Sequence, residues 1–311
     1  MYYVGIDIGG TTVKGMIADE KGNIVCENYV DTVKGGEGLT ENVVNLVDIL
    51  LKQSGLKKAD IAGIGMGSPG LINSEEGKIV FAGNLQIHDY PLADKIKEKT
   101  GIPVKLTNDA NAAALGEAKF GAAKEYSDSI FITLGTGVGG GVIINGKLYE
   151  GYKSAGTELG HMVIQKDGEQ CSCGRKGCFE AYGSATALIR KTKEVMKSHT
   201  DSLMWSKYNL GTVCGKPPFD FCDSDKYAKE IVDWYVSYLA CGLANFSNIF
   251  RPQVFLIGGG VSNAGDKLIK PLTEKFEKEI FGGNDYCPVV IKQASLGNKA
   301  GAFGAIALFL D

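Results

Sequence analysis

The stretch YYVGIDIGGTTVKGMIADEKGNIV, residues 2–25, decides the fold, because its layout returns later in the chain. An apolar strand pattern runs into a turn of glycines and threonines, a second apolar stretch follows, and a hairpin turn at 19–23 leads to a return strand. Residues 129–149, SIFITLGTGVGGGVIINGKLY, repeat this order, with the Gly/Thr turn at 136–141 and the next strand at 142–146. We therefore predict an internal duplication of structural pattern rather than a repeat of fixed sequence period.

Glycine-rich turns follow predicted strands at three places, residues 9–12, 135–141 and 258–262. A loop of backbone N–H groups after a strand suits the phosphates of a nucleotide. None of the three matches the Gly-x4-Gly-Lys-Ser/Thr pattern of a P-loop, and the Gly-x-Gly-x-x-Gly pattern of dinucleotide binding fits poorly. Two matching halves, each with one Gly/Thr turn, predict a nucleotide held in a cleft between them.

The segment between these halves alternates helix and strand patterns. Helical periodicity covers 39–53 and 91–100, and strands are expected at 61–66 and 103–106, with a further helix at 112–119. This order predicts a mixed or parallel sheet covered by helices, with ligands at the carboxyl ends of its strands. Asn108 and Asp109 lie at such a junction. A helix cap accounts for one polar residue there, whereas an ionised Asp can also accept a hydroxyl proton.

The second half of the chain is expected to be mostly helical. Helices are predicted at 184–197, from 266, and at 299–309, where the last one packs back on the first domain. The long apolar pattern at 224–249 indicates a core helix or a subunit contact, and strands are expected at 254–257 and 289–292. Residues 198–222 are polar and irregular, which is typical of a surface segment or a lid.

Residues 158–180, ELGHMVIQKDGEQCSCGRKGCFE, contain a metal-type cluster. His161, Cys171, Cys173 and Cys178 are the ligand set of a closed tetrahedral zinc site. Reduced, buried cysteines that happen to cluster are the alternative, as are a catalytic zinc and a redox cluster. Because four protein ligands leave no position open for substrate, we interpret the ion as a structural Zn²⁺.

Composition excludes several classes of protein. The net charge of −3 and the lack of a basic run argue against nucleic acid and membrane surfaces as partners. No segment approaches the ~20 apolar residues that span a bilayer. The chain starts directly in a strand pattern without a leader, and three of its eight cysteines belong to the metal cluster. We therefore expect a cytoplasmic protein in a reducing compartment.

These motifs together resemble a known family. Asp7-Ile-Gly-Gly-Thr11 and Leu134-Gly-Thr-Gly137 are similar to the two phosphate loops of the actin, Hsp70 and sugar-kinase superfamily, and Gly258-Gly-Gly-Val261 to its adenosine motif. With Glu158-Leu-Gly-His161 and Cys171-x-Cys-Gly-x-x-Gly-Cys178-x-Glu180, the chain is identified as a member of the ROK family, resembling its bacterial ATP-dependent glucokinases. Repressor members carry a helix-turn-helix before the first phosphate loop. Only six residues precede Asp7, so we expect none here.

The resemblance implies roles for individual residues. Asp109 would be the general base, and Asp7 would orient Mg²⁺ or its water. The hexose would bind to Gly70, Asn84, Asn108, Asp109, Glu158, His161 and Glu180, with the zinc holding Glu158, His161 and Glu180 in place. ATP would bind to Asp7, Gly9, Gly10, Thr11, Thr12, Lys14, Gly135, Thr136, Gly137, Gly258, Gly259 and Gly260.

The implied activity is ATP-dependent phosphorylation of a hexose, D-glucose first, at its 6-hydroxyl. The alternatives are a ROK kinase for N-acetylglucosamine, N-acetylmannosamine, mannose, fructose or allose, and a sugar-sensing protein without turnover. The implied fold is the two-domain α/β actin/Hsp70/sugar-kinase (ribonuclease H-like) fold, with one domain of residues 1–118 plus 297–311 and another of 119–296. Relatives form dimers or tetramers, so a homodimer or homotetramer is expected.

Overall fold

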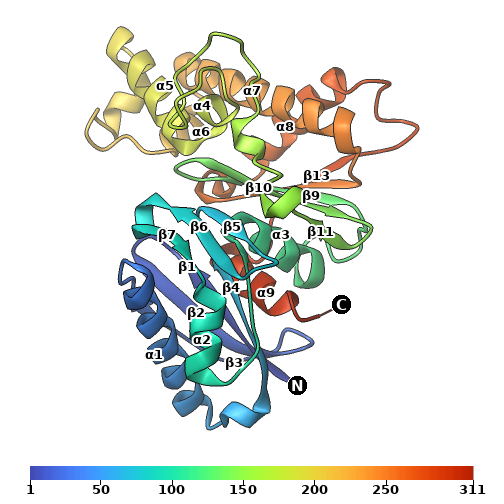
Figure 1. The fold of residues 1–311 in the computed structure, drawn as a ribbon. Coiled ribbons are helices and arrows are strands. Elements are labelled where there is room, and N and C mark those ends of the chain that lie inside the picture. The colour runs from blue at the N-terminus through green and yellow to red at the C-terminus, as the bar shows by residue number, and fades with distance from the viewer. Residues whose placement is uncertain (311) are drawn as a thin grey trace. The chain divides into compact units, whose positions relative to one another are not determined.

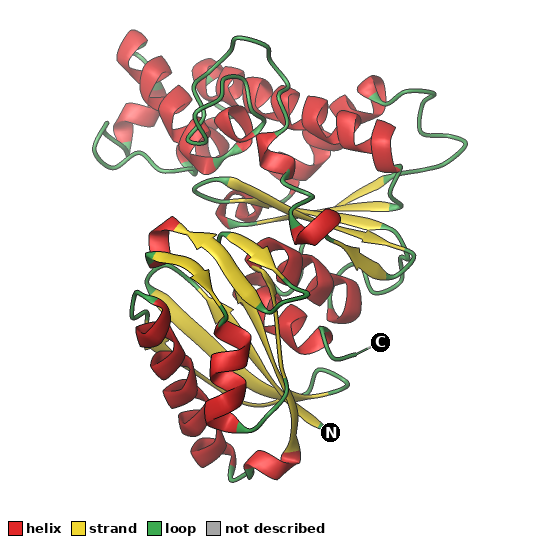
Figure 2. Cartoon of the chain, viewed as in Figure 1, coloured by secondary structure: helices red, strands yellow, loops and turns green. Residues whose placement is uncertain are grey.

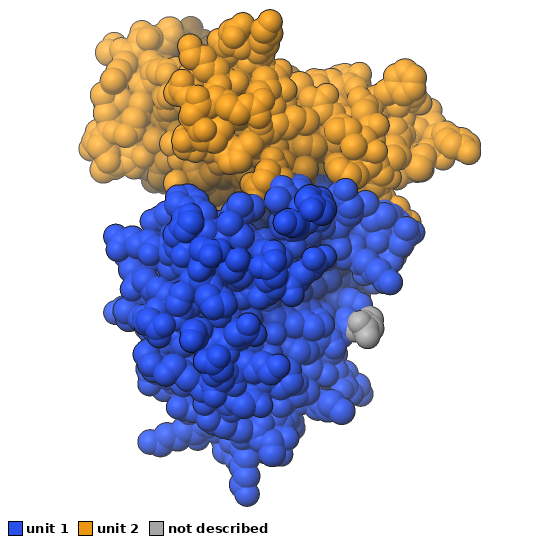
Figure 3. Space-filling model, in the orientation of Figure 1, with its two compact units in different colours: residues 1–131, 141–157, 295–311 blue, residues 132–140, 158–294 orange. Residues whose placement is uncertain are grey.

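The computed structural model describes residues 1–310, which form two compact units (Figure 3). Unit 1 comprises residues 1–131, 141–157 and 295–310, and unit 2 comprises 132–140 and 158–294. The C-terminal segment thus belongs to the same unit as the N-terminus. The domain boundaries expected from the sequence, 118/119 and 296/297, stay a prediction.

A five-stranded mixed sheet forms the centre of unit 1. Its strand order is β3-β2-β1-β4-β8, with β1 antiparallel to β2 and parallel to β4. Apolar residues alternate with small ones on the central strands, so both sheet faces are buried. The strands are β1 (Tyr2–Ile8), β2 (Thr12–Asp19), β3 (Ile24–Asp31), β4 (Ile61–Ser68) and β8 (Val104–Asn108).

Helices cover both faces of this sheet (Figures 1 and 2). The helices α1 (Gly36–Ser54) and α2 (Leu92–Thr100) share one apolar core with the strands. On the other face lie α3 (Asp109–Phe120) and α9 (Ala300–Ala307). Both α1 and α2 end at a glycine in the left-handed conformation, Gly55 and Gly101. The sequence prediction for these helices is confirmed, although α1 and α3 each begin three residues earlier than expected.

Close backbone contact holds α9 against α3 and the sheet. A methyl group on Gly304 would lie 1.5 Å from the Ala112 carbonyl oxygen, and one on Gly116 would lie 2.3 Å from that of Ala300. On β4, a methyl group at Gly65 would lie 1.7 Å from the Ala305 carbonyl oxygen. Only glycine allows this approach, so these positions fix α9 on α3, the helix that begins with Asp109.

A second, three-stranded sheet in unit 1 was not predicted. Its antiparallel strands are β5 (Leu71–Asn73), β6 (Lys78–Ala82) and β7 (Ile87–Tyr90), with a short 3-10 helix, Gly83–Leu85, between the last two. The strands are short, and Phe81 and Leu71 are exposed, so their hydrophobic alternation is weak. The loop assigned to Asn84 is therefore part of a compact hairpin.

The other five-stranded sheet has the order β11-β10-β9-β12-β13. Counted along the chain, both sheets place their strands in the order third, second, first, fourth and fifth, which confirms the predicted duplication. One boundary was wrong: Val138–Gly141 were expected in a turn, but they begin β10. The strands are β9 (Ser129–Leu134), β10 (Val138–Ile144), β11 (Lys147–Tyr149), β12 (Val254–Gly258) and β13 (Val290–Gln293).

Unit 2 is rich in helices around an aromatic core that includes Phe179, Tyr235 and Phe246. Within residues 198–222, Met204 and Phe219 are buried and part of the segment is helical, so this stretch is anchored to the core. Among the described residues, none of the helices combines the length and apolarity that a membrane span needs. The helices are α4 (Glu180–Gly183), α5 (Ala185–Ser198), α6 (Pro217–Phe221), α7 (Lys226–Phe250) and α8 (Asp266–Glu279).

Candidate active site

Asn108 lies where β8 ends and α3 begins, and its side chain is the N-cap of α3. The Oδ1 atom accepts the N–H groups of Ala110 at 2.9 Å and Asn111 at 3.3 Å. Its Nδ2 atom donates to the Gly70 carbonyl oxygen at 3.2 Å. Gly70 has φ 104°, and a methyl group there would lie 2.3 Å from the Phe81 carbonyl oxygen. Asn108 therefore fixes both the helix start and the turn after β4.

Asp109 is the first residue of α3 and a partly buried carboxylate. Its Oδ1 atom accepts the N–H of Ala110 at 2.8 Å. Burial raises the pKa of the Asp109 carboxyl, while the N–H groups at the helix start act in the opposite direction. A carboxylate with a raised pKa is, in its ionised form, a better proton acceptor than an exposed aspartate.

Asp7 lies near the end of β1, where burial and the negative charge of Asp109 raise its pKa to about 6. Lys14, opposite Asp7 in the β1–β2 register, lowers the pKa in part. A methyl group on Gly301 would lie 2.9 Å from the Asp7 carboxyl, so α9 packs directly against this group. Two carboxylates whose charges interact in one buried region attract a cation, which is consistent with a divalent metal.

The Gly/Thr turn after β1 is closed by its own backbone. Gly9 N–H donates to the Thr12 carbonyl oxygen at 2.9 Å, and Thr32 Oγ1 donates to the Gly9 carbonyl oxygen at 2.8 Å. Gly10 and Thr11 are exposed at the tip of the turn. A methyl group on Gly10 would lie 3.5 Å from Asn84 Nδ2, so the side chain of Asn84 lies beside this turn. The arrangement presents backbone and hydroxyl donors to a ligand.

The matching turn at 135–137, in unit 2, is held by α4 and α5. Thr186 Oγ1 donates to the Thr136 carbonyl oxygen at 2.7 Å, and Ala185 N–H donates to that of Gly135 at 2.8 Å. Val138 N–H donates to Glu180 Oε2 at 3.1 Å. Thr186 was not predicted from the sequence. In the sequence, Thr186 looks like an ordinary residue of the first turn of a helix.

The third glycine run ends β12. Gly258 is buried, and Gly259 has φ 80° with room for no side chain, since a methyl group would lie 2.5 Å from the Leu134 carbonyl oxygen. Gly260 starts a short 3-10 helix and is exposed. The run therefore brings exposed backbone to the end of the strand that neighbours β9.

His161, Cys171, Cys173 and Cys178 gather into one cluster, with their ligand atoms within 4.8 Å of one another. Cys173 Sγ lies 3.7 Å from Cys178 Sγ, and Cys171 Sγ lies 3.7 Å from His161 Nδ1. In a tetrahedron with zinc–sulfur bonds of about 2.3 Å, neighbouring sulfurs are about 3.8 Å apart. Burial raises the pKa of Cys178 to about 12, so a thiolate there requires a cation. The donor set fits Zn²⁺, with Nδ1 as the histidine ligand.

Glycines and one tyrosine shape the loop around this cluster. Gly177, at φ 79°, leaves no space for a side chain, since a methyl group would lie 1.7 Å from the Gln165 carbonyl oxygen. The Tyr182 hydroxyl accepts Glu169 N–H at 2.8 Å, and its ring stacks on Tyr238 with centroids 4.2 Å apart. The loop is therefore fastened to α4 and α7.

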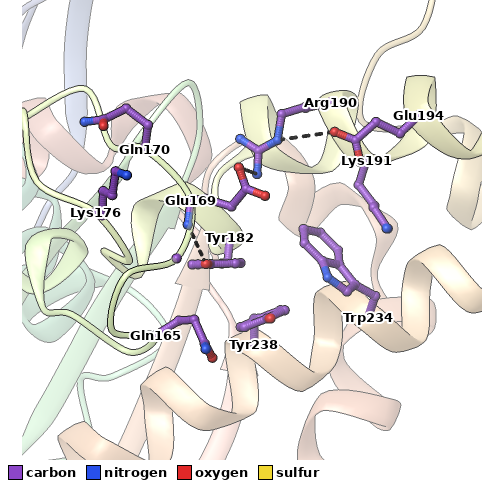
Figure 4. Close-up of a pocket in the computed structure, with 11 residues that line it drawn as sticks. Gln165, Glu169, Gln170, Lys176, Tyr182, Arg190, Lys191, Glu194, Trp234 and Tyr238 are labelled. Atoms are coloured by element: carbon purple, nitrogen blue, oxygen red, sulfur yellow. Dashed lines mark hydrogen bonds and ion pairs between the residues drawn. The ribbon is translucent and has the colours of Figure 1, made fainter.

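A pocket of about 480 Å³ opens beside the outer part of this loop (Figure 4). Tyr182, Trp234 and Tyr238 form its aromatic side. Three of the charged groups around it form ion pairs with one another: Arg190 lies 3.6 Å from Glu169 and 3.8 Å from Glu194. The pocket contains none of the residues that the sequence assigned to substrate or nucleotide.

The two glutamates that flank the metal loop differ in their surroundings. Glu158 is exposed. Glu180 is partly buried, and its Oε1 atom accepts Ser172 Oγ at 2.8 Å and contacts Cys171 Sγ at 3.5 Å. Because Oε2 accepts Val138 N–H, Glu180 joins the metal loop to the Gly/Thr turn. This connection was not predicted, since the sequence assigned Glu180 to the sugar alone.

The predicted site residues fall into two sets, one in each unit. Within unit 1, Asp7 and Asp109 interact, Asn108 contacts Gly70, and Asn84 lies beside Gly10. Within unit 2, Glu180 connects the cluster to the turn at 135–137. Unit 1 holds Asp7, Gly9, Gly10, Thr11, Thr12, Lys14, Gly70, Asn84, Asn108 and Asp109, and unit 2 holds Gly135, Thr136, Gly137, Glu158, His161, Cys171, Cys173, Cys178, Glu180, Gly258, Gly259 and Gly260.

Two sheets of one strand order, each with a glycine turn after its first strand, define the actin, Hsp70 and sugar-kinase type of fold. The family model described as ROK family matches residues 3–311, and the chain belongs to the ROK family.

Relatives of the chain include kinases and repressors. The chain is 39% identical to a glucokinase of Halalkalibacterium halodurans, over 97% of this chain and 93% of that protein. It is 33% identical to a xylose repressor of Bacillus subtilis, over 100% of this chain and 77% of the repressor. Among solved structures, a ROK family glucokinase from Streptomyces griseus in complex with glucose and AMPPNP is 33% identical, with a TM-score of 0.83 and 99% of both chains covered.

Proposed function

We propose that this protein is an ATP-dependent hexose kinase that phosphorylates the 6-hydroxyl group of the sugar, with D-glucose as its preferred hexose. The observation that carries the proposal is Asp109, a partly buried carboxylate with a raised pKa at the start of α3. Similarity to glucokinases over nearly the whole chain, one of them solved with glucose and AMPPNP, supports the same conclusion.

In the proposed reaction, Asp109 accepts the proton of the sugar 6-hydroxyl. The sugar oxygen then forms a bond to the γ-phosphorus of ATP as the bond to the leaving ADP oxygen breaks. Asn108 and Gly70 hold the turn beside the base, and Glu158, His161 and Glu180 supply further polar groups to the hexose. A pyranose needs several such partners, because each unpaired hydroxyl is costly.

The nucleotide phosphates are assigned to the two Gly/Thr turns, with the turns after β1 and β9 donating N–H and hydroxyl groups. Mg²⁺, bound with Asp7, would neutralise charge that develops on the phosphates. The glycines after β12 are assigned to the adenosine. Zn²⁺ at His161, Cys171, Cys173 and Cys178 is structural in this proposal, and thiolate ligands of this kind persist in a reducing cytoplasm.

A coupled ATP/ADP assay over a panel of hexoses tests the proposal. We expect ADP release with glucose, and lower kcat/KM with N-acetylglucosamine, N-acetylmannosamine, mannose, fructose and allose. Best activity with an N-acetyl sugar would instead identify the protein as a ROK kinase for N-acetylglucosamine or N-acetylmannosamine. Sugar binding without ADP release would favour a sugar sensor, the function that the similarity to a xylose repressor raises.

Light scattering would test the proposed homodimer or homotetramer.

The pH dependence of kcat/KM for the hexose follows from the carboxylates of the site. Asp109 must be ionised to accept a proton, and its pKa is raised by burial. Asp7 interacts with it and has a pKa of about 6. The two carboxylates interact, so we expect activity to fall as the pair takes up a proton. The Asp7 pKa of about 6 sets this fall above the ordinary aspartate value of about 4. A rate that stays constant from pH 7 to about 4.5 would contradict this assignment.

Thr186 gives a test of the turn at 135–137. Its hydroxyl donates to the Thr136 carbonyl oxygen, so Thr186→Val removes one hydrogen bond that holds the turn. We expect KM for ATP to rise about 3- to 10-fold, with KM for the sugar little changed. Thr192→Val is the matched control, since the Thr192 hydroxyl bonds to Leu188 within the same helix. Equal KM values for ATP in both variants would refute the assignment.

A further inference from the structure

The carboxylate of Glu150 connects three segments of unit 1. Its Oε1 atom accepts Thr107 Oγ1 at 2.6 Å and Ser74 Oγ at 2.7 Å, and lies 3.4 Å from Asn111 Nδ2. Thr107 belongs to β8, Ser74 to the turn between β5 and β6, and Asn111 to the first turn of α3. Short hydrogen bonds from hydroxyls to a carboxylate are among the stronger polar contacts in proteins.

Two of these partners flank Asp109 in the chain. Thr107 lies two residues before it and Asn111 two residues after it, and both are buried, at 0% and 3% exposure. Their side chains therefore face protein rather than water, and Glu150 supplies the acceptor they share. The orientation of the β8–α3 junction depends on this contact as well as on the Asn108 cap.

The loop that follows Glu150 is strained and tied to the same partners. Lys153, Ser154 and Thr157 have φ values of 52°, 56° and 59°, which non-glycine residues rarely adopt. Gly156 N–H donates to the Glu150 carbonyl oxygen at 2.7 Å and closes the loop. Ser74 N–H donates to Ser154 Oγ at 3.2 Å, and Thr157 Oγ1 lies 3.5 Å from Asn111 Oδ1. The strained loop and the helix start therefore share one polar network.

We propose that Glu150 is a positioning residue for sugar phosphorylation. It holds the junction that bears Asp109 and the loop that leads in sequence to Glu158, and it acts through Thr107, Asn111 and Ser74 rather than by touching the substrate. The inference rests on the proposed function. The residues assigned to ATP in unit 1, including Gly9–Thr12, make none of these contacts with Glu150. The effect on catalysis therefore concerns the sugar and the base.

Steady-state kinetics of Glu150→Ala, Glu150→Gln and Ser74→Ala test the proposal, with melting temperatures measured alongside. We expect Glu150→Ala to lower kcat about 10- to 100-fold, because small displacements of a base are costly, while KM for ATP stays nearly constant. Glu150→Gln should recover most of the rate, since its amide oxygen can replace Oε1. Ser74→Ala should lower kcat/KM for the sugar about 3-fold.

Glu76→Gln is the matched control, because Glu76 lies in the same turn as Ser74 but its carboxylate pairs with Lys78 at the surface, at 3.3 Å. A folded Glu150→Ala variant with unchanged kcat would overturn the proposal. If that variant does not fold, Ser74→Ala with wild-type kinetics would overturn it.

A wild-type chain that phosphorylates no hexose would refute the proposed function instead. Glu150 would then be tested by calorimetric sugar binding without ATP. Weaker binding in Glu150→Ala, a smaller loss in Ser74→Ala and affinity near wild type in Glu150→Gln would support it. Equal affinity in every variant would refute it.

Discussion

Replacing Asp109 by Asn should abolish almost all phosphoryl transfer while the sugar still binds. The change keeps the size of the side chain, and the amide oxygen can still accept the Ala110 N–H that Asp109 Oδ1 accepts at 2.8 Å. It removes the group that takes the hydroxyl proton. A general base contributes about 100- to 10,000-fold to a rate, so kcat should fall by that factor. The kcat of Asp109→Ala should fall at least as far.

The measurement is a coupled assay for kcat, with glucose affinity obtained by calorimetry in the absence of ATP. Asp89→Asn is the matched control. It makes the same chemical change at an exposed aspartate of unit 1 that pairs with Lys78 at 2.8 Å. Near-normal turnover in Asp109→Asn would refute its role as base. Loss of glucose binding together with turnover would instead assign Asp109 to sugar binding.

Removing one thiolate from the metal cluster should release zinc and weaken sugar binding together. Cys171→Ser and Cys173→Ser each leave three of the four ligands His161, Cys171, Cys173 and Cys178. Without the ion, the loop loses the cross-link that holds Glu158, His161 and Glu180. Removing groups that orient the ligands of a metal typically costs about 10- to 100-fold in metal affinity or activity, and we expect a drop of this size in glucose affinity.

Metal content by mass spectrometry and glucose affinity by calorimetry check this prediction. Cys287→Ser is the control, since Cys287 is an exposed thiol outside the cluster. Because Glu180 also accepts Val138 N–H, KM for ATP should rise in the zinc-free protein as well. Zinc loss with intact sugar binding and turnover would show that the metal does not support the site.

Local sequence patterns were sufficient for much of the fold. The glycine turns, the alternation of strands and helices, and the repeated strand order all appear as hydrophobic periods and turn residues close together in the chain. The cluster of His161, Cys171, Cys173 and Cys178 could be predicted for the same reason, because three cysteines and a histidine lie within eighteen residues. Such patterns are local in the sequence, so they can be recognised without knowledge of the tertiary structure.

Contacts between distant residues were missed. Glu150 contacts Ser74, which is 76 positions away in the sequence, and Thr107, which is 43 positions away. Nothing near Glu150 in the sequence indicates these contacts. The small sheet at 71–90 was not predicted because its strands are short and partly exposed. The glycines of Val138–Gly141 predict a turn, because glycine is rare in strands. A methyl group at Gly141 would lie 2.5 Å from the Ala114 side chain, so close packing requires glycine in the strand at that position.

The central claim is transfer of the γ-phosphoryl group of ATP to the 6-hydroxyl of a hexose. Phosphorus NMR of the wild-type protein incubated with glucose, ATP and Mg²⁺ tests it most directly. The predicted result is one new phosphate monoester whose phosphorus couples to the two protons of carbon 6, formed in step with ADP. An unchanged ATP spectrum, release of inorganic phosphate alone, or an ester at carbon 1 would contradict the account.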